Sequence, residues 1–156
     1  MGVGFNLGQM FDNDQHAANL ETARPKIDAY YARGFRTLRI PVTWTEPIAG
    51  TTLADPNTGA LDTAFPRLAE LARVVEYGLS KPGLHVVLNA HHEAALKDHG
   101  RADVLGRLWA EIANHFGHYD GRLMYEILNE PDLSNHESME PTTLRRLTRA
   151  AFQDLG

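Results

Sequence analysis

The chain has 156 residues, a formal net charge of -5 and no cysteine, with 43% apolar and 22% charged residues. This length is enough for one domain with a sizeable core, and the composition is ordinary for a soluble globular protein. The acidic balance argues against nucleic-acid and anionic-membrane partners, which usually require a basic face. Without cysteine there is no disulfide, zinc–thiolate site or cysteine nucleophile.

Hydropathy predicts neither a membrane span nor a secretion signal. No stretch approaches the roughly 18 consecutive apolar residues of a membrane-spanning helix. The first ten residues, MGVGFNLGQM, lack a basic region followed by a long apolar one, so the chain as given is expected to carry no signal peptide. No low-complexity segment or linker interrupts residues 1–156, which are expected to form a single domain.

In the first half of the chain, two strand signals each precede a helix signal. Residues 3–7 (VGFNL) predict a strand and residues 22–33 a helix. Residues 36–42 (RTLRIPV) predict the second strand. Residues 45–63 are rich in Pro, Gly, Thr and Asp and predict a long loop. Residues 65–79 then carry apolar residues at helical spacing.

The second half repeats this alternation. Residues 84–90 (LHVVLNA) form a nearly continuous apolar run, typical of a buried parallel strand. An amphipathic helix is predicted over 105–116 and a fourth strand over 122–128 (RLMYEIL). Pro141 opens a last helix that is expected to reach Leu155. Strands that alternate with helices predict βαβ units, and therefore an α/β fold with a parallel sheet.

Two architectures have this (βα)4 pattern, a small doubly wound sheet and the first half of a (β/α)8 barrel. The polar residues favour the barrel, because they gather where the strands end. Barrels carry their chemistry on that rim, although open parallel sheets use the same end. The residues are Asn6 after the first strand, Trp44 after the second, His91, His92 and Glu93 after the third, and Asn129 and Glu130 after the fourth.

Glu130 is the first candidate for chemistry. It follows the apolar pair Ile127-Leu128 and stands between Asn129 and Pro131. A general acid needs desolvation or a neighbouring charge to raise its pKa, and the end of a buried strand provides such a place. The competing interpretation is a solvated loop glutamate that happens to precede a proline.

His91 and His92 are the second candidates. Because strand side chains alternate, the two are expected to point to opposite faces, which disfavours a joint metal site. One of them would face the barrel mouth as a hydrogen-bonding group, and otherwise the histidine is structural. Trp44 is either a sugar-stacking platform or a core aromatic residue. Asn6 is either a contact on the rim or a turn former.

Arg39 lies in the middle of the second strand, where a buried charge needs a partner. Glu126 is the expected partner, on the same predicted strand face as Glu130. Their contact would be purely structural, or Arg39 would orient the catalytic carboxylate.

Together these residues resemble family 5 of the glycoside hydrolases, the cellulase family. The resemblance covers essentially the whole chain. It implies a (β/α)8 barrel enzyme that hydrolyses β-linked glucosides or short β-glucans with retention of configuration. The matching segments are GFNLG at 4–8, GFRTLRIPVTW at 34–44, VVLNAHHE at 86–93, and LWAEIANHFG followed by LMYEILNEP within 108–131.

The resemblance also implies roles for individual residues. Glu130 matches the general acid/base, and Asn129 matches the asparagine that binds the sugar 2-hydroxyl. Arg39 and His91 match the arginine and histidine on the floor of the active site. Further residues that match the same site are Asn6, Trp44, His92 and Glu93.

The chain departs from the family in length. A retaining glycosidase needs two carboxylates about 5–5.5 Å apart, and the family's nucleophile ends the seventh strand. The (βα)4 pattern is half of a TIM (β/α)8 barrel, which takes roughly 250 residues. Such a half exposes two strand edges and an inner face, so two copies are expected to close one ring as a two-fold homodimer.

In such a ring, Glu93 of one copy would approach the partner's Glu130 and stand in for the nucleophile. A dimer-dependent glycoside hydrolase therefore competes with two alternatives, a carbohydrate-binding half barrel without catalysis and an inactive fragment. No phosphate-binding glycine loop or credible metal spacing is found, so no cofactor is expected. By the resemblance, secretion is common among relatives.

Overall fold

The computed structural model describes residues 2–135 and 137–154. Its centre is a sheet of parallel strands in the order β1-β2-β3-β4, which confirms the α/β fold with a parallel sheet. Each strand is shorter than the apolar segment that predicts it, because backbone pairing stops before the apolar residues do. The strands are β1 (Gly4–Asn6), β2 (Thr37–Ile40), β3 (His85–Asn89) and β4 (Leu123–Glu126).

The helices are α1 (Leu20–Ala32), α2 (Pro66–Ser80), α3 (Ala94–Asp98), α4 (Ala102–Phe116) and α5 (Pro141–Asp154). All but α3 confirm a predicted helix. The sequence pattern does not predict α3, because a helix of 5 residues is too short to show an apolar stripe. Leu155, the expected end of the last helix, lies outside the described residues. Within those residues, no helix combines the length and the apolar character needed to cross a membrane.

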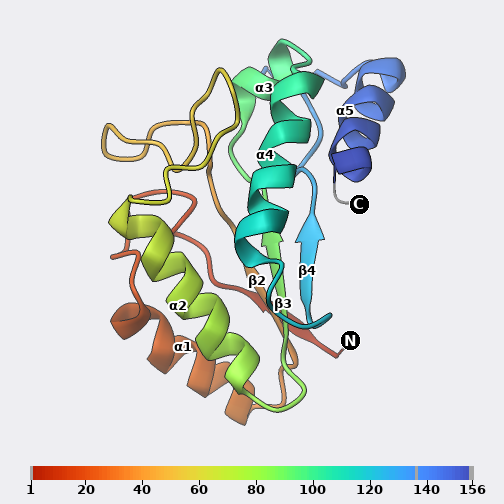
Figure 1. The fold of residues 1–156 in the computed structure, drawn as a ribbon. Helices are drawn as coiled ribbons and strands as arrows, with labels where there is room; N and C mark the ends of the chain where they lie inside the picture. The colour runs from red at the N-terminus through yellow and green to blue at the C-terminus, as the bar shows by residue number, and fades with distance from the viewer. Residues whose placement is uncertain (1, 136, 155–156) are drawn as a thin grey trace.

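Helices α1, α2 and α4 cover the same face of the sheet (Figure 1). This follows from the strand order, because every crossover joins adjacent strands and right-handed crossovers then place each helix on one side. A doubly wound sheet instead has helices on both faces and a reversal in its strand order. The doubly wound alternative is therefore wrong, and the sheet is the wall of half a barrel.

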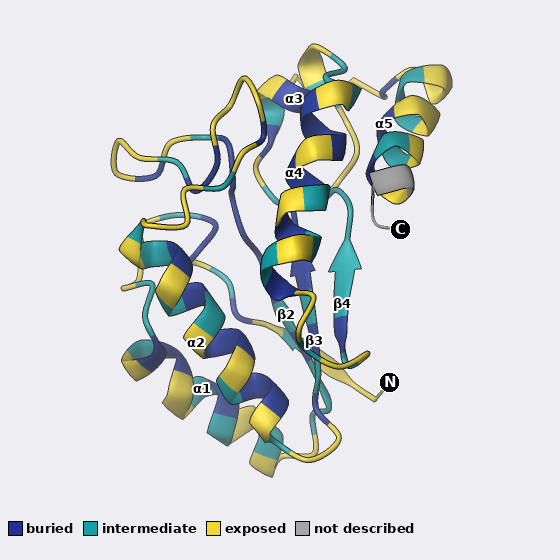
Figure 2. Cartoon of the chain, viewed as in Figure 1, coloured by how far each residue is buried: buried dark blue, intermediate teal, exposed yellow. Residues whose placement is uncertain are grey.

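The two faces of the sheet differ in burial. Leu38 and Ile40 of β2 and Val86 and Leu88 of β3 are fully buried. Figure 2 shows the buried parts of the helices and the sheet in dark blue. The alternate residues face the other side and are mostly only half-buried. A cavity of about 280 Å³ lies on that side, and its lining includes Asn6, Thr37, Arg39, Val87 and Glu126. In a closed barrel this inner face is filled by side chains from both halves.

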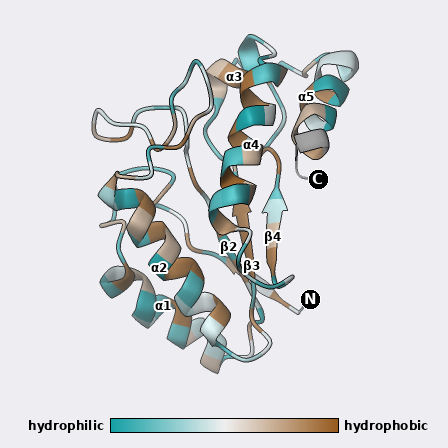
Figure 3. Cartoon of the chain, in the orientation of Figure 1, coloured by the Kyte–Doolittle hydropathy of each residue, from teal (hydrophilic) through white to brown (hydrophobic). Residues whose placement is uncertain are grey.

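Helix α4 supplies much of the core between helices and sheet. Apolar and polar segments alternate along it (Figure 3), and Trp109 and Phe116 are buried as expected. Tyr31 of α1 is half-buried against the core. Tyr30, the preceding residue, is instead 41% exposed. Its ring stacks on Phe5 at the edge of the sheet, with ring centroids 4.3 Å apart.

Candidate active site

A bidentate ion pair on the inner face joins two strands that are not neighbours. Arg39 Nε donates to Glu126 Oε2 at 2.7 Å, and Arg39 Nη2 donates to Glu126 Oε1 at 2.5 Å. The pair spans β3 and connects β2 to the last residue of β4. The predicted contact between these two side chains is confirmed.

The same guanidinium reaches two amides on the rim. Arg39 Nη2 donates to Asn129 Oδ1 at 2.9 Å, and Nη1 donates to Asn6 Oδ1 at 3.3 Å. Asn6 is therefore a contact residue on the inner face and not a turn former. Hydrogen bonding to Glu126 raises the pKa of Arg39, and the same bonds lower the pKa of the Glu126 carboxyl. Both groups therefore stay charged at neutral pH, and the pair is a fixed support for Asn129.

Glu130 has an exposed side chain on a strained backbone. Its φ of 39° lies in the left-handed region, which is rare for a residue other than glycine and costs about 1–3 kcal/mol. The Glu130 carbonyl oxygen accepts hydrogen bonds from Asp132 N at 2.6 Å and Lys97 Nζ at 3.2 Å. On the other side, Asn129 N donates to Ala90 O at 2.8 Å, next to the end of β3. These hydrogen bonds hold the backbone of the turn, and the backbone in turn sets the direction of the Glu130 side chain.

The expectation that His91 and His92 point to opposite faces is wrong. β3 ends at Asn89 and β4 at Glu126, so the two-residue alternation does not extend to the residues that follow. The rings of His91 and His92 lie side by side, with centroids 4.4 Å apart, instead of on opposite faces. Glu130 also lies beyond the last paired residue of β4, so alternation does not fix the face of its side chain either.

His91 is tied to a buried amide that sequence reasoning missed. Asn89 is fully buried, and its Oδ1 accepts from Val42 N at 3.2 Å. Its Nδ2 lies 3.2 Å from His91 Nδ1 and donates to Glu126 Oε1 at 3.4 Å. Burial, and next the neighbouring His92, lower the pKa of His91, so its ring is a neutral hydrogen-bonding group at neutral pH. The signal that could have identified Asn89 is a polar residue inside the apolar run VVLNA.

Glu93 is fully buried and faces the loop after β2. Its carboxylate accepts hydrogen bonds from Trp44 N at 2.6 Å, from Thr45 N at 3.1 Å and from the Thr45 hydroxyl. Burial raises the pKa of this carboxyl to about 7. A nucleophile must reach the sugar, and Glu93 has no exposed surface in the single chain. Its position therefore opposes the predicted catalytic role. Its hydrogen bonds instead stabilise the loop after β2.

Trp44 is also fully buried, and its Nε1 donates to Asn89 O at 2.9 Å. Trp44 is therefore a core aromatic residue and not a platform for sugar stacking. His92 is exposed beside His91. Asp12, which the sequence pattern did not single out, is buried next to both histidines.

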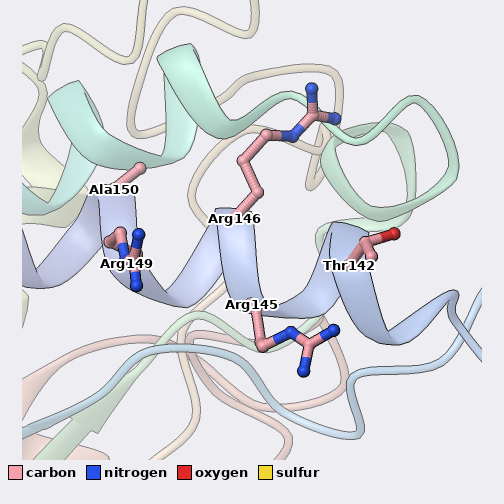
Figure 4. A pocket seen from close by; sticks show the side chains of 5 residues that line it. All are labelled: Thr142, Arg145, Arg146, Arg149 and Ala150. Atoms are coloured by element: carbon pink, nitrogen blue, oxygen red, sulfur yellow. The ribbon is translucent and has the colours of Figure 1, made fainter.

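A larger cavity, of about 360 Å³, lies along α5 and involves none of the predicted site residues. Figure 4 shows the arginine side chains that line it. Arg146 donates to Gly100 O at 2.9 Å, which fastens α5 to the loop before α4. The lining residues are Thr142, Arg145, Arg146, Arg149 and Ala150.

A half barrel whose polar site lies at the carboxyl ends of its strands defines a protein of the (β/α)8-barrel class. The family model Cellulase (glycosyl hydrolase family 5) matches residues 2–154. The chain therefore belongs to glycosyl hydrolase family 5, as the four sequence segments indicated.

Individual relatives agree with this assignment. Endoglucanase B of Ruminococcus albus is 34% identical over 148 residues, which cover 85% of this chain and 34% of that protein. A GH5-4 broad specificity endoglucanase from Clostridium longisporum superposes with a TM-score of 0.78 at 28% identity, over 99% of this chain and 49% of that one. The cellulose synthase subunit Z of Clostridioides difficile superposes with a TM-score of 0.80 at 25% identity, over 99% of this chain and 48% of that one. The chain thus spans about a third of the curated relative and about half of the solved structures.

Proposed function

We propose that this chain carries the acid/base half of a glycoside hydrolase site for β-linked glucans, with Glu130 as the general acid/base. The observation that carries the proposal is the hydrogen bond between Arg39 and Asn129, because it orders the residue next to Glu130 at the carboxyl end of β4. Membership of family 5 and relatives named as endoglucanases support the same activity.

The hydrogen bonds suggest what each neighbour contributes. Arg39 occupies the side-chain oxygen of Asn129, which leaves the amide NH2 to donate to a sugar hydroxyl. His91, kept neutral by burial, and the exposed His92 offer further hydrogen bonds on the rim. Asn6 closes the other end of the Arg39 network, on β1. These residues would orient the sugar so that Glu130 reaches the glycosidic oxygen.

Hydrolysis needs a second carboxylate, about 5–5.5 Å from Glu130 if configuration is retained and about 6.5–9.5 Å if it is inverted. Glu93 is a poor candidate in the single chain because it is buried and engaged by Trp44 and Thr45. The chain spans about half of its solved relatives, so in this proposal the second carboxylate would come from the unit that completes the barrel.

We further propose that a second (βα)4 unit covers the inner face, and that in the isolated chain this unit is a second copy. The support is the cavity on that face and the two open strand edges, at β1 and β4, in the described sheet. Light scattering on a size-exclusion column tests this directly. We expect a dimer that dissociates on dilution and loses its activity as it does so. A monomer at high concentration would contradict the proposed dimer.

Hydrolysis of an aryl β-cellobioside tests the catalytic role. Glu130→Gln should lower kcat by about 10²–10⁴-fold, while Glu111→Gln, on the exposed side of α4, should leave it unchanged. If the wild-type chain binds cello-oligosaccharides saturably without turnover, it is a binding half barrel instead. If it neither binds nor hydrolyses them, it is an inactive fragment.

A further inference from the structure

Asp12, His91 and His92 bring a carboxylate and two imidazoles together from the loops that follow β1 and β3. One potential ligand atom of each residue lies within 4.8 Å of those of the other two. We propose that these three residues bind a divalent transition-metal ion, with Zn²⁺ as the representative case. The proposal is independent of the hydrolytic activity.

The residue types fit such an ion. Imidazole nitrogen and carboxylate oxygen bind Zn²⁺ at about 2.0–2.2 Å, so two ligand atoms of one tetrahedral ion lie about 3.3–3.6 Å apart. The ligand atoms here lie within 4.8 Å of one another, so side chains have to move by about 1 Å to close on an ion. His92 is exposed and free to rotate by that amount. Three protein ligands leave a position for water, as in other open zinc sites.

Asp12 is the fixed member of the group. It is buried, Oδ1 accepts from Met10 N at 3.2 Å, and Oδ2 accepts from Asn13 Nδ2 at 3.3 Å. The Thr43 hydroxyl donates to Asp12 O at 3.0 Å and ties this loop to the loop after β2. Hydrogen-bonded partners of this kind orient a ligand and are part of most protein metal sites.

A cavity of about 190 Å³ opens beside the group and gives an ion a path and room for water ligands. Asp12 and His92 line it, together with Asp14 and Glu46. Three carboxylates around one small cavity lower the local potential, which concentrates cations there. The negative charge of the cavity and the types of ligand residue therefore both favour a metal cation.

His91 makes one adjustment when the ion binds. Its Nδ1 faces the amide of Asn89, so Nε2 is the nitrogen that turns to the ion. The ring proton then sits on Nδ1, and the contact with the Asn89 amide opens, because Val42 N and Glu126 hold that amide in its present orientation. If His91 and His92 also contact sugar, an ion here would exclude substrate. That consequence alone rests on the proposed function.

Titration calorimetry with ZnCl2 on the full chain tests the site, with Co²⁺ absorption as a probe of coordination. One ion per chain is expected, and affinity should fall by about tenfold or more in His92→Ala and in Asp12→Asn. His99→Ala, an exposed histidine at the end of α3, is the matched control and should bind as wild type does.

Three results would overturn the proposal: no binding by wild type, unchanged binding in His92→Ala, or an equal loss in His99→Ala. Because His92 is exposed, its variant should fold even if Asp12→Asn does not. The measurement involves no sugar, so its failure is separate from failure of the glycosidase assignment.

Discussion

The guanidinium of Arg39 meets the carboxylate of Glu126 edge to edge across β3, with N–O distances of 2.7 and 2.5 Å. Both side chains lie on the inner face and are only partly exposed, at 22% and 35%. Both charges have lost part of their hydration. Removing one partner therefore leaves the other charge unpaired in a half-buried site. The pair therefore contributes to stability as well as to the order of Asn129.

A double-mutant cycle should measure this coupling. Arg39→Met and Glu126→Gln are each expected to lower the free energy of unfolding by about 1–3 kcal/mol. The double variant should lose less than the sum, with a coupling of about 1–2 kcal/mol by urea unfolding.

The pair Arg122–Asp120 supplies the control. Its N–O distance is 2.8 Å, but Asp120 is 57% exposed and lies only two residues from Arg122. Its coupling should stay near 0.5 kcal/mol or below. Equal coupling in the two cycles would contradict the stabilising role assigned to the inner-face pair.

The left-handed backbone of Glu130 predicts a conflict between stability and activity. Glu130→Gly and Glu130→Ala both remove the carboxylate, but only glycine relieves the strain of a φ of 39°. The glycine variant should therefore be more stable than the alanine variant by about 1 kcal/mol in urea. The two variants should be equally inactive.

The same pair of substitutions at Glu111, inside α4, should give the opposite order. There, glycine is expected to be less stable than alanine by about 1 kcal/mol, because the site is helical. If alanine were also the more stable residue at position 130, the strain assigned to that turn would be absent.

The sequence predicts the sheet, four helices and the Arg39–Glu126 contact, because apolar periodicity and buried charge act within elements. It predicts badly where elements end. His91 and His92 lie together because alternation stops with backbone pairing, which no periodic pattern marks. Asp12 was missed because only the fold brings the loop after β1 to the loop after β3.

Glycine substitutions should test how the long loop docks on α4. A Cβ on Gly59 would come within 2.6 Å of Val104 O and 2.8 Å of Leu108 N, and its φ is +78°. Gly83 has a similar φ of +71° but open space around it. Gly83→Ala should cost about 1 kcal/mol, from the backbone alone. Gly59→Ala should cost at least about 1–3 kcal/mol more, because its methyl group overpacks against α4. Equal losses in thermal unfolding would mean that the loop moves aside freely.

The buried carboxyl of Glu93 should make stability depend on pH. Its pKa rises from an ordinary 4.5 to about 7 on folding, chiefly through burial. Between these values the folded chain holds a proton that the unfolded chain has lost, so raising the pH favours unfolding. The contribution is fully present below pH 4.5 and is lost as pH rises through about 7, which amounts to about 3 kcal/mol.

Glu93→Gln keeps the shape of the side chain but cannot ionise, so it isolates this effect from the other titrating groups. The unfolding free energy of wild type minus that of Glu93→Gln should fall by about 3 kcal/mol between pH 4.5 and pH 8. Urea unfolding at half-unit pH steps measures the difference. A constant difference would mean that the bonds from Trp44 and Thr45 offset the burial of the charge, and that Glu93 stays ionised in the folded chain.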